Sequence, residues 1–325
     1  MTAPSLPPPP SPVSRETNPT DVVSRETIGL AAVGNHADTP IAAAAAAAVR
    51  VLNPRAEDHF PRPGSRRIVT VANQKGGVGK TTSTVNLAVG LALHGQRVLV
   101  LDLDPQGNTS TALGIDHHAD IPSIYDVLIN GDTLDEVVQP VVGFDSLWCA
   151  PATLNLAGAE IELVPAVARE YRLRRAIEAY GQELDYVFID CPPSLGLLTL
   201  NSLVAGAEVL IPIQCEYYAL EGLTQLLRTI EMVKEHLNHE LTISTILLTM
   251  YDSRTRLADA VAADVRQHFT DLVLQTAIPR SVRVSEAPGY GQSVITYDPG
   301  SRGAMAYVEA AREIAYRSGQ GGGSA

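Results

Sequence analysis

The sequence predicts an α/β fold: a doubly wound, mostly parallel sheet flanked by helices. Two observations carry this prediction. Short apolar segments, the composition of strands buried on both faces, occupy residues 67–72, 97–103, 186–190 and 208–213. Segments with helical patterns lie between them, which is the order that produces parallel strands joined by helices. Because ligands of such sheets bind at the carboxyl ends of the strands, a site is expected where these strands end.

Composition divides the chain into three parts. Residues 1–64 hold eleven of the twenty-two prolines and an alanine run at 42–48, and they offer too little bulky apolar surface to offset the entropy of ordering. We expect this extension to be disordered, with a short helix over about residues 39–52 as its one candidate for order. Residues 65–317 have the apolar content of one α/β domain, and residues 318–325 form a flexible glycine-rich tail.

Charge, hydropathy and cysteine usage argue against several classes of protein. No apolar stretch approaches the roughly 20 residues that span a bilayer, and the N-terminus lacks a secretion-signal pattern, so we expect a cytoplasmic protein without membrane contact. The net charge of −12 argues against wholesale coating of nucleic acid, although a local basic patch is compatible with it. Cys149, Cys191 and Cys215 lack C-x-x-C spacing, which favours reduced core thiols over a zinc or disulfide framework.

A glycine-rich loop joins the first predicted strand to the helix that follows it. The chain has three lysines against twenty-one arginines, and two of the three lie in the string Lys75-Gly76-Gly77-Val78-Gly79-Lys80-Thr81-Thr82. The glycines allow successive N–H groups to point inward around an anion, and the helix N-terminus adds partial positive charge. A compact ammonium enters such a crowded cradle where a guanidinium would clash. The string therefore predicts that Gly76 to Thr82 bind a nucleoside triphosphate, with Lys80 at the β- and γ-phosphates and Thr81 ligating Mg²⁺.

The start of the loop departs from the ordinary phosphate-loop pattern. That pattern, G-x-x-x-x-G-K-[ST], requires glycine at position 74, whereas this chain has Gln74 followed by Lys75. The variant K-G-G-x-G-K-[ST]-T resembles the deviant Walker A ATPases, a family of P-loop NTPases that includes the ParA and MinD partition and positioning ATPases and the nitrogenase iron protein. The resemblance implies ATP and Mg²⁺ as cofactors. It also implies an ATP-bound homodimer in which Lys75 crosses the interface to the partner's phosphates, so that Lys75 and Lys80 both serve catalysis. The plain alternative is a glycine turn flanked by solvated lysines, which the adjoining strand and helix disfavour.

Two aspartates follow predicted strands that end beside this loop. Asp104 follows the strand at 97–103, and the resemblance implies that it positions or activates the attacking water. Its plain alternative is an N-cap or turn aspartate, and Asp102 is given no separate role. Asp190 ends the apolar strand that begins at Tyr186 and precedes two prolines, which is the Walker B arrangement, so we expect it to hold Mg²⁺ through water.

Three segments of the C-terminal half narrow the resemblance to chromosomal ParA proteins of the Soj type. They are residues 247–255, 278–288 and 297–304, and the likeness extends over nearly all of residues 66–317. It implies a weak intrinsic ATPase that partitions chromosome origins. The ATP-bound sandwich dimer would bind double-stranded DNA non-specifically on the nucleoid and leave it when ParB stimulates hydrolysis. The N-terminal extension is a candidate binding site for a polar scaffold protein.

The same resemblance assigns further nucleotide and DNA contacts. Pro279 and Arg280 would lie near the adenine, and Glu216, in a segment similar to the family's E-Y-x-A-L-x-G, would lie near the nucleotide or the dimer partner. Arg254 and Arg283 would carry DNA binding. A weaker third candidate for DNA binding is Arg302. From residue 251 to residue 318 the chain has eight arginines and eight acidic residues, so each arginine taken alone is more readily interpreted as a solvated or salt-bridged surface residue. The assignment of these arginines to DNA binding therefore depends on the family resemblance.

Three other functions remain as alternatives. A MinD-like membrane-cycling ATPase needs a basic amphipathic C-terminal helix, whereas this chain ends in a glycine-rich tail. An iron–sulfur electron-transfer ATPase needs clustering cysteines, which Cys191 and its two counterparts do not offer by spacing. A nucleotide-switched DNA-binding scaffold or regulator would not need turnover, and ATP hydrolysis with and without ParB and DNA separates it from the partition ATPase.

Overall fold

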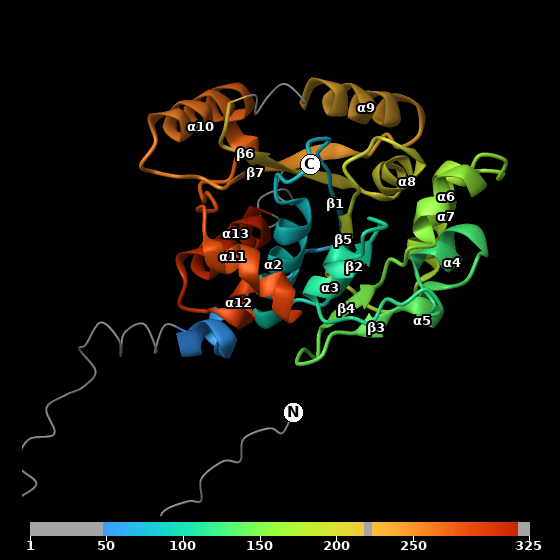
Figure 1. The fold of residues 1–325 in the computed structure, drawn as a ribbon, viewed down its shortest axis with the longest axis horizontal. Coiled ribbons are helices and arrows are strands. Elements are labelled where there is room, and N and C mark those ends of the chain that lie inside the picture. Colours follow the sequence, from blue (N-terminus) through green and yellow to red (C-terminus); the bar gives the residue numbers. More distant parts are fainter. Residues whose placement is uncertain (1–47, 218–222, 318–325) are drawn as a thin grey trace, which may run out of the picture.

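A seven-stranded sheet forms the centre of the protein, a computed structural model that describes residues 48–217 and 223–317 (Figure 1). The strand order is β3-β4-β2-β5-β1-β6-β7; β3 is antiparallel to β4, and the other pairs are parallel. This confirms the predicted doubly wound, mostly parallel sheet. The strands are β1 (Arg67–Val71), β2 (Val98–Asp102), β3 (Gln139–Pro140), β4 (Leu147–Ala150), β5 (Tyr186–Asp190), β6 (Glu208–Gln214) and β7 (Thr242–Thr249).

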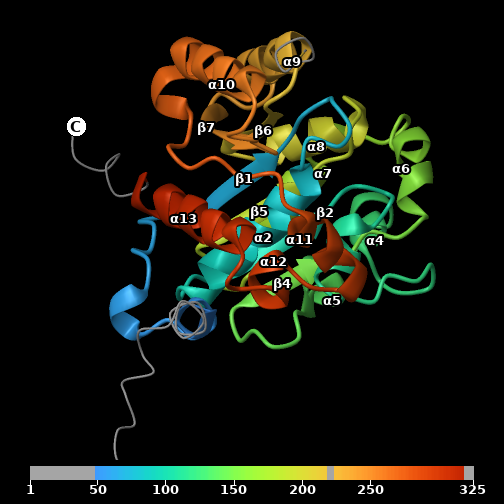
Figure 2. The same cartoon turned by 60° about the vertical axis from the view of Figure 1, so that its left-hand side comes forward.

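Helices cover both faces of the sheet and create two hydrophobic cores (Figures 1 and 2). Every residue of β2 and of β5 is buried, which explains why these strands are apolar without alternation. One face carries α2 (Lys80–Leu93), α3 (Asn108–Ala112), α11 (Val282–Glu286), α12 (Val294–Tyr297) and α13 (Arg302–Arg317). The other carries α4 (Ile124–Ile129), α5 (Leu134–Val137), α6 (Leu156–Glu162), α7 (Arg172–Ala179), α8 (Leu197–Ala205), α9 (Leu223–His236) and α10 (Arg256–Phe269). Short 3-10 turns are η2 (Ala56–Asp58), η3 (Arg169–Tyr171), η4 (Thr270–Leu272) and η5 (Ala287–Tyr290).

Helix α2 is enclosed between the sheet and α13 (Figure 2). Eleven of its fourteen residues are buried; they include Lys80 and hydroxyl and amide side chains near its start, whereas the residues from Leu87 to Leu93 are apolar or glycine. Gly90 allows α13 to approach closely, because a Cβ atom at this position would lie 3.1 Å from the Cβ of Ala311. The N-terminal end of α2 is thereby fixed relative to the strand ends.

Part of the predicted N-terminal extension packs onto the domain. The ring of Phe60 stacks on His94, with centroids 4.1 Å apart. The Phe60 N–H donates to the His94 carbonyl at 3.0 Å, and Gln96 Nε2 donates to the Phe60 carbonyl at 2.9 Å. The disorder expected for most of the extension therefore does not reach Phe60, because this aromatic side chain finds a buried partner at the end of α2. The predicted boundary at residue 64 stays a prediction.

The remaining expectations for the termini fall mostly outside the described residues. Residues 48–52 are helical, which matches the C-terminal end of the helix considered for residues 39–52. The rest of that segment, and the tail at 318–325, lie outside the described residues.

Phe60→Ala should lower the free energy of unfolding by about 3 kcal/mol, the cost of removing a buried aromatic ring. The ring is 7% exposed and belongs to the core cluster of α2 and α13. Denaturant unfolding measures the change. Val142→Ala is the control, because Val142 is 89% exposed and should shift stability by less than about 0.5 kcal/mol. Equal stability of the Phe60 variant and the wild type would show that the segment does not anchor to the domain.

Candidate active site

The glycine loop runs from the end of β1 to the start of α2. Gly77 and Gly79 have φ values of 73° and 91°, in the left-handed region that only glycine adopts without strain. Apart from the adjacent residues, no heavy atom of the described chain lies within 4 Å of the position a Cβ would take at Gly76 or Gly77, so the backbone here is open to a ligand. Gly79 is the N-cap of α2, which aims the unpaired N–H groups of a 14-residue helix at the loop. The loop therefore has the shape and polarity of a phosphate site.

Lys80 places its ammonium inside this loop. The residue is 7% exposed, and its Nζ donates to the Lys75 carbonyl at 3.3 Å. Burial lowers the pKa of Lys80, and the charges of Asp190 and Asp104 partly oppose that effect. A cation held at this position without direct carboxylate contact remains available to a phosphate.

Lys75 begins the same loop and is half-buried. Its N–H donates to Asn73 Oδ1 at 3.0 Å, and the Asn73 Nδ2 donates to the Pro212 carbonyl at 2.8 Å, so the loop start is tied to β6. Within residues 48–217 and 223–317, no ion pair of the Lys75 ammonium is recorded. Its predicted role across a dimer interface stays a prediction.

The Asp190 carboxylate, at the end of β5, accepts hydrogen bonds from three threonine hydroxyls. Its Oδ2 accepts from Thr81 Oγ1 at 2.7 Å and from Thr109 Oγ1 at 2.8 Å, and its Oδ1 accepts from Thr84 Oγ1 at 3.3 Å. Complete burial raises the pKa of Asp190 to about 6. A carboxylate beside the Thr81 hydroxyl is a hard oxygen donor set, which fits Mg²⁺. Thr84 and Thr109 were not predicted from the sequence, although a buried strand-end carboxylate indicates that several donors must surround it.

Asp102 organises the loop that presents Asp104. In the sheet register Asp102 lies opposite Asp190, and burial together with the Asp190 charge raises the pKa of Asp102 to about 7. Its Oδ2 accepts from the Ser110 N–H at 2.9 Å and from Ser110 Oγ at 2.7 Å, while its Oδ1 accepts from the Asp104 N–H at 3.2 Å. Asp102 thus has a positioning role that sequence analysis did not assign.

Asp104 itself is 8% exposed and lies near Lys80 and Asp190, whose pKa values its charge affects. Its Oδ1 accepts from the Gln106 N–H at 3.0 Å, which fixes the carboxylate plane. No hydrogen bond to its Oδ2 is recorded in the described part of the chain. One oxygen of a fixed carboxylate is therefore available next to the phosphate loop.

A cavity of about 110 Å³ adjoins the start of α2 on the side of β7. The Thr249 hydroxyl donates to the Val78 carbonyl at 2.8 Å, which ties the end of β7 to the glycine loop. Met250 follows with a φ of 50°, an uncommon left-handed conformation for a non-glycine residue that sequence analysis did not anticipate. The cavity is lined by Gly79, Thr82, Thr249, Met250, Ile278, Pro279, Arg280, Ser281, Val284, Ser285 and Tyr307. Pro279 and Arg280 thus line the same cavity as Thr82, and their predicted place near the adenine stays a prediction.

Glu216 does not line this cavity. Its Oε1 accepts from Arg280 Nη2 at 2.6 Å, and both side chains are about half exposed. The segment that was compared with the family's E-Y-x-A-L-x-G continues through residues 218–222, which lie outside the described residues.

The three predicted DNA-binding arginines lie on exposed segments. Arg254 follows β7 and pairs with Asp252 at 2.8 Å, whereas Arg283 on α11 pairs with Glu286 at 3.0 Å and with Asp298 at 3.3 Å. Arg302 is the first residue of α13 and has no ion pair recorded among the described residues. Arg254 and Arg302 line one cavity of about 440 Å³, and Arg283 does not line it.

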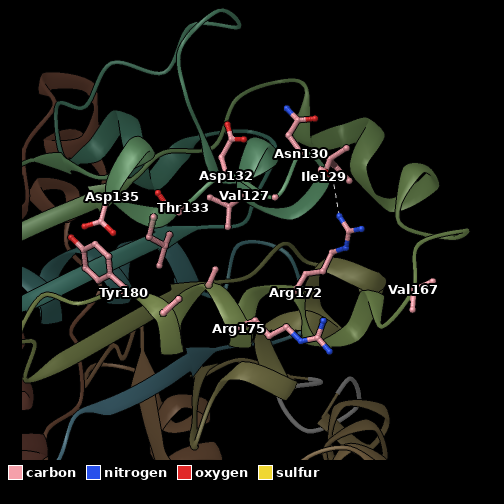
Figure 3. A pocket seen from close by; sticks show the side chains of 14 residues that line it. Val127, Ile129, Asn130, Asp132, Thr133, Asp135, Val167, Arg172, Arg175 and Tyr180 are labelled. Atoms are coloured by element: carbon pink, nitrogen blue, oxygen red, sulfur yellow. Dashed lines mark hydrogen bonds between the residues drawn. The ribbon is translucent and has the colours of Figure 1, made fainter.

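A separate cavity of about 410 Å³ lies between α4, α5 and α7 (Figure 3). Arg172 Nη1 spans one end of it and donates to the carbonyls of Leu128 at 2.5 Å and Ile129 at 3.0 Å. None of the predicted site residues lines this cavity, which sets it apart from the glycine loop.

Membrane contact and clustered metal ligands are the features that two of the alternatives require. No helix of the described residues is long and apolar enough to cross a bilayer, and no group of three or more histidine, cysteine or acidic side chains there is arranged to hold a metal. Cys149, Cys191 and Cys215 are all buried and free, and burial raises the pKa of each thiol.

The fold and the site together define a P-loop nucleoside triphosphatase with a second lysine at the start of its loop. A model of the AAA domain family matches residues 66–243. Over 251 residues the chain is 54% identical to the sporulation initiation inhibitor protein Soj of Bacillus subtilis, covering 77% of this chain and 98% of Soj. It is 49% identical to the chromosome partitioning protein ParA of Myxococcus xanthus, covering 77% of this chain and 88% of that protein. The chain belongs to the Soj/ParA family of chromosome-partitioning ATPases.

A solved structure extends the likeness to three dimensions. The cobyrinic acid a,c-diamide synthase of Mycobacterium smegmatis, with bound ATP analog and magnesium, superposes with a TM-score of 0.69 at 38% identity. The match covers 79% of this chain and 97% of that one.

Proposed function

We propose that this ATPase moves or tethers chromosome origins through a cycle of DNA binding governed by ATP. The ATP-bound form is a sandwich dimer that binds double-stranded DNA without sequence preference on the nucleoid, and ParB-stimulated hydrolysis releases it. The observation that carries the proposal is that the segment from Pro279 to Ser281 lines two cavities. One is the cavity beside the glycine loop, and the other is the cavity lined by Arg254 and Arg302. A nucleotide site and a basic surface therefore adjoin through one short segment.

The glycine loop supplies the nucleotide-binding half of the proposal. Its open backbone and the buried Lys80 would hold the phosphates, and Thr81 with Asp190 would hold Mg²⁺. The metal ion, when bound, neutralises charge on the phosphate oxygens. The Oδ2 of Asp104, which no hydrogen bond from the described residues engages, can accept from a water and orient it. The Asp102 and Gln106 contacts keep the Asp104 loop and carboxylate in place.

Dimerisation brings a second lysine, Lys75 of the partner subunit, to the phosphates. Lys75 is half-buried, its backbone is anchored through Asn73, and its ammonium has no recorded ion pair in the described residues. The family string that contains Lys75 supports its placement against the phosphates of a partner subunit. A lysine delivered from the partner makes hydrolysis depend on the dimer, because transition-state charge is then incompletely stabilised in the monomer.

DNA binding rests on a local surface and not on overall charge. The net charge of −12 repels DNA at long range, so contacts must come from clustered arginines such as Arg254 and Arg302. A dimer presents two copies of the surface, which multiplies the number of phosphates neutralised. Because released counterions drive such binding, its affinity should fall steeply with salt.

Arg283→Ala should weaken binding of the ATP-loaded protein to non-specific duplex by at least about tenfold and lower the salt slope by about two per dimer. Titration of a labelled duplex with ATP, with ADP and without nucleotide measures both quantities. Arg312→Ala is the matched control: Arg312 is 56% exposed and pairs with Glu309 three residues away, and Arg283 is 55% exposed and pairs with Glu286 at the same spacing. Wild-type affinity in the Arg283 variant at equal ionic strength would refute the assignment. Absence of ATP-dependent duplex binding in the wild type would refute the proposed function.

A further inference from the structure

Three arginines from separate segments line the cavity of about 440 Å³, which we call the arginine cavity. Arg254 comes from the loop after β7, Arg280 from the loop before α11, and Arg302 from the first turn of α13. The hydroxyl residues Ser253 and Ser281 also line it. Guanidinium groups with serine hydroxyls around a concave surface form a recognition set for phosphate oxygens.

Arg280 is held by an acid that lies outside the cavity. Glu216, two residues after the end of β6, accepts from Arg280 Nη2 at 2.6 Å. Across the described residues, the Glu216 carboxylate has no other recorded hydrogen bond. Asp252, the one acid lining the cavity, differs: its carboxylate also accepts from the Arg254 N–H at 3.1 Å and so shapes the turn. Among the residues that the structure describes, the Glu216 carboxylate therefore contacts the Arg280 guanidinium alone.

We propose that Arg280 is a further contact for a DNA phosphate and that Glu216 masks it in the nucleotide-free protein. This inference rests on the proposed function, since it assigns a phosphate ligand to the arginine cavity. A carboxylate and a phosphate oxygen compete for the same guanidinium donors. With Glu216 in place, DNA must displace one charge-assisted hydrogen bond and meets one more negative charge, so the affinity of the free protein is held down.

The position of Arg280 allows nucleotide to act on this contact. Pro279, Arg280 and Ser281 line the cavity beside the glycine loop as well as the arginine cavity. The Arg280 N–H donates to the Tyr251 carbonyl at 3.0 Å, which fixes the backbone while the side chain stays half exposed. A nucleoside in the first cavity would thus touch the segment whose side chain Glu216 restrains.

The test is a double-mutant cycle with Glu216→Gln, Arg280→Ala and the double variant, measured on the full chain without nucleotide. A labelled duplex of arbitrary sequence is titrated over a series of salt concentrations. Glu216→Gln should bind about three- to tenfold tighter at low salt, with a salt slope steeper by about one per protomer, because one more phosphate is neutralised. Arg280→Ala should keep the wild-type slope, and the double variant should match Arg280→Ala. Glu309→Gln removes an exposed, arginine-paired acid on α13, 56% exposed against 43% for Glu216, and should leave binding unchanged.

The outcomes separate the two proposals. An unchanged salt slope in Glu216→Gln overturns the masking of Arg280, and so does a gain in duplex affinity that persists in the double variant. The proposed function still stands in either case if the wild type binds duplex with ATP. A lower slope in Arg280→Ala alone also overturns masking, because Arg280 would already contact phosphate. No duplex binding by any variant in any nucleotide state overturns both proposals. Matched thermal unfolding of the four proteins excludes misfolding as the cause.

Discussion

Asp104→Ala should reduce ATP turnover by at least about 100-fold, the contribution expected of a positioned group that orients or deprotonates water. The Asp104 carboxylate accepts a hydrogen bond at its Oδ1, and its charge acts on both Lys80 and Asp190. In the described part of the chain no hydrogen bond engages its Oδ2. ATP binding, dimerisation and DNA binding should persist, because the change leaves the glycine loop intact. Phosphate release with DNA and ParB present measures turnover, and sedimentation with ATP measures the dimer.

Asp145→Ala is the control for the loss of an aspartate, since Asp145 lies exposed in the loop before β4 and should keep wild-type turnover. If Asp104→Ala hydrolyses ATP at the wild-type rate, another group orients the water. Loss of the ATP-bound dimer in the same variant would show instead that Asp104 is structural, as an N-cap or turn aspartate is.

Lys75→Ala should abolish the ATP-dependent dimer, raising its dissociation constant by at least about 100-fold, because the partner's phosphates lose a charge-assisted contact in a water-poor interface. Nucleotide binding by the monomer should change by only a few-fold, since Lys80 and the glycine loop remain. Sedimentation velocity in the Asp104→Ala background measures the dimer without hydrolysis, and a fluorescent ATP analog measures the affinity for nucleotide.

Two further variants sharpen this test. Lys75→Arg should also fail to dimerise, because a guanidinium is too broad for the cradle that a compact ammonium enters. Lys234→Ala removes the third lysine of the chain, on α9, and should dimerise as the wild type does. An unchanged dimer in Lys75→Ala would refute the cross-subunit role.

Local patterns in the sequence were enough to predict the centre of the site. The apolar residues 67–72 predicted a strand, the string from Lys75 to Thr82 a glycine loop, and the pattern from Lys80 onward a helix. β1, the loop and α2 have this order. Asp104 and Asp190 follow apolar strands, and a parallel sheet necessarily brings such strand ends to one edge. These predictions succeeded because backbone sterics and strand direction act over a few residues.

Other features depended on contacts between distant segments. Asp102 became a positioning residue only because α3 brings Ser110 to its carboxylate, and Phe60 became a core residue only because the end of α2 offers His94 for stacking. The pairing of Glu216 with Arg280 joins residues 64 positions apart, and neither residue type indicates its partner.

By itself, the sequence determined the fold class, the glycine loop between β1 and α2 and the two strand-end acids, because hydrophobic periodicity and glycine geometry are local properties. Only the tertiary structure decided which hydroxyls surround Asp190 and which carboxylate pairs with Arg280. It also decided that the segment from Pro279 to Ser281 lines both the cavity beside the glycine loop and the arginine cavity. The physical reason is that hydrogen bonds and ion pairs depend on side-chain positions within fractions of an ångström, and packing of the whole chain sets those positions.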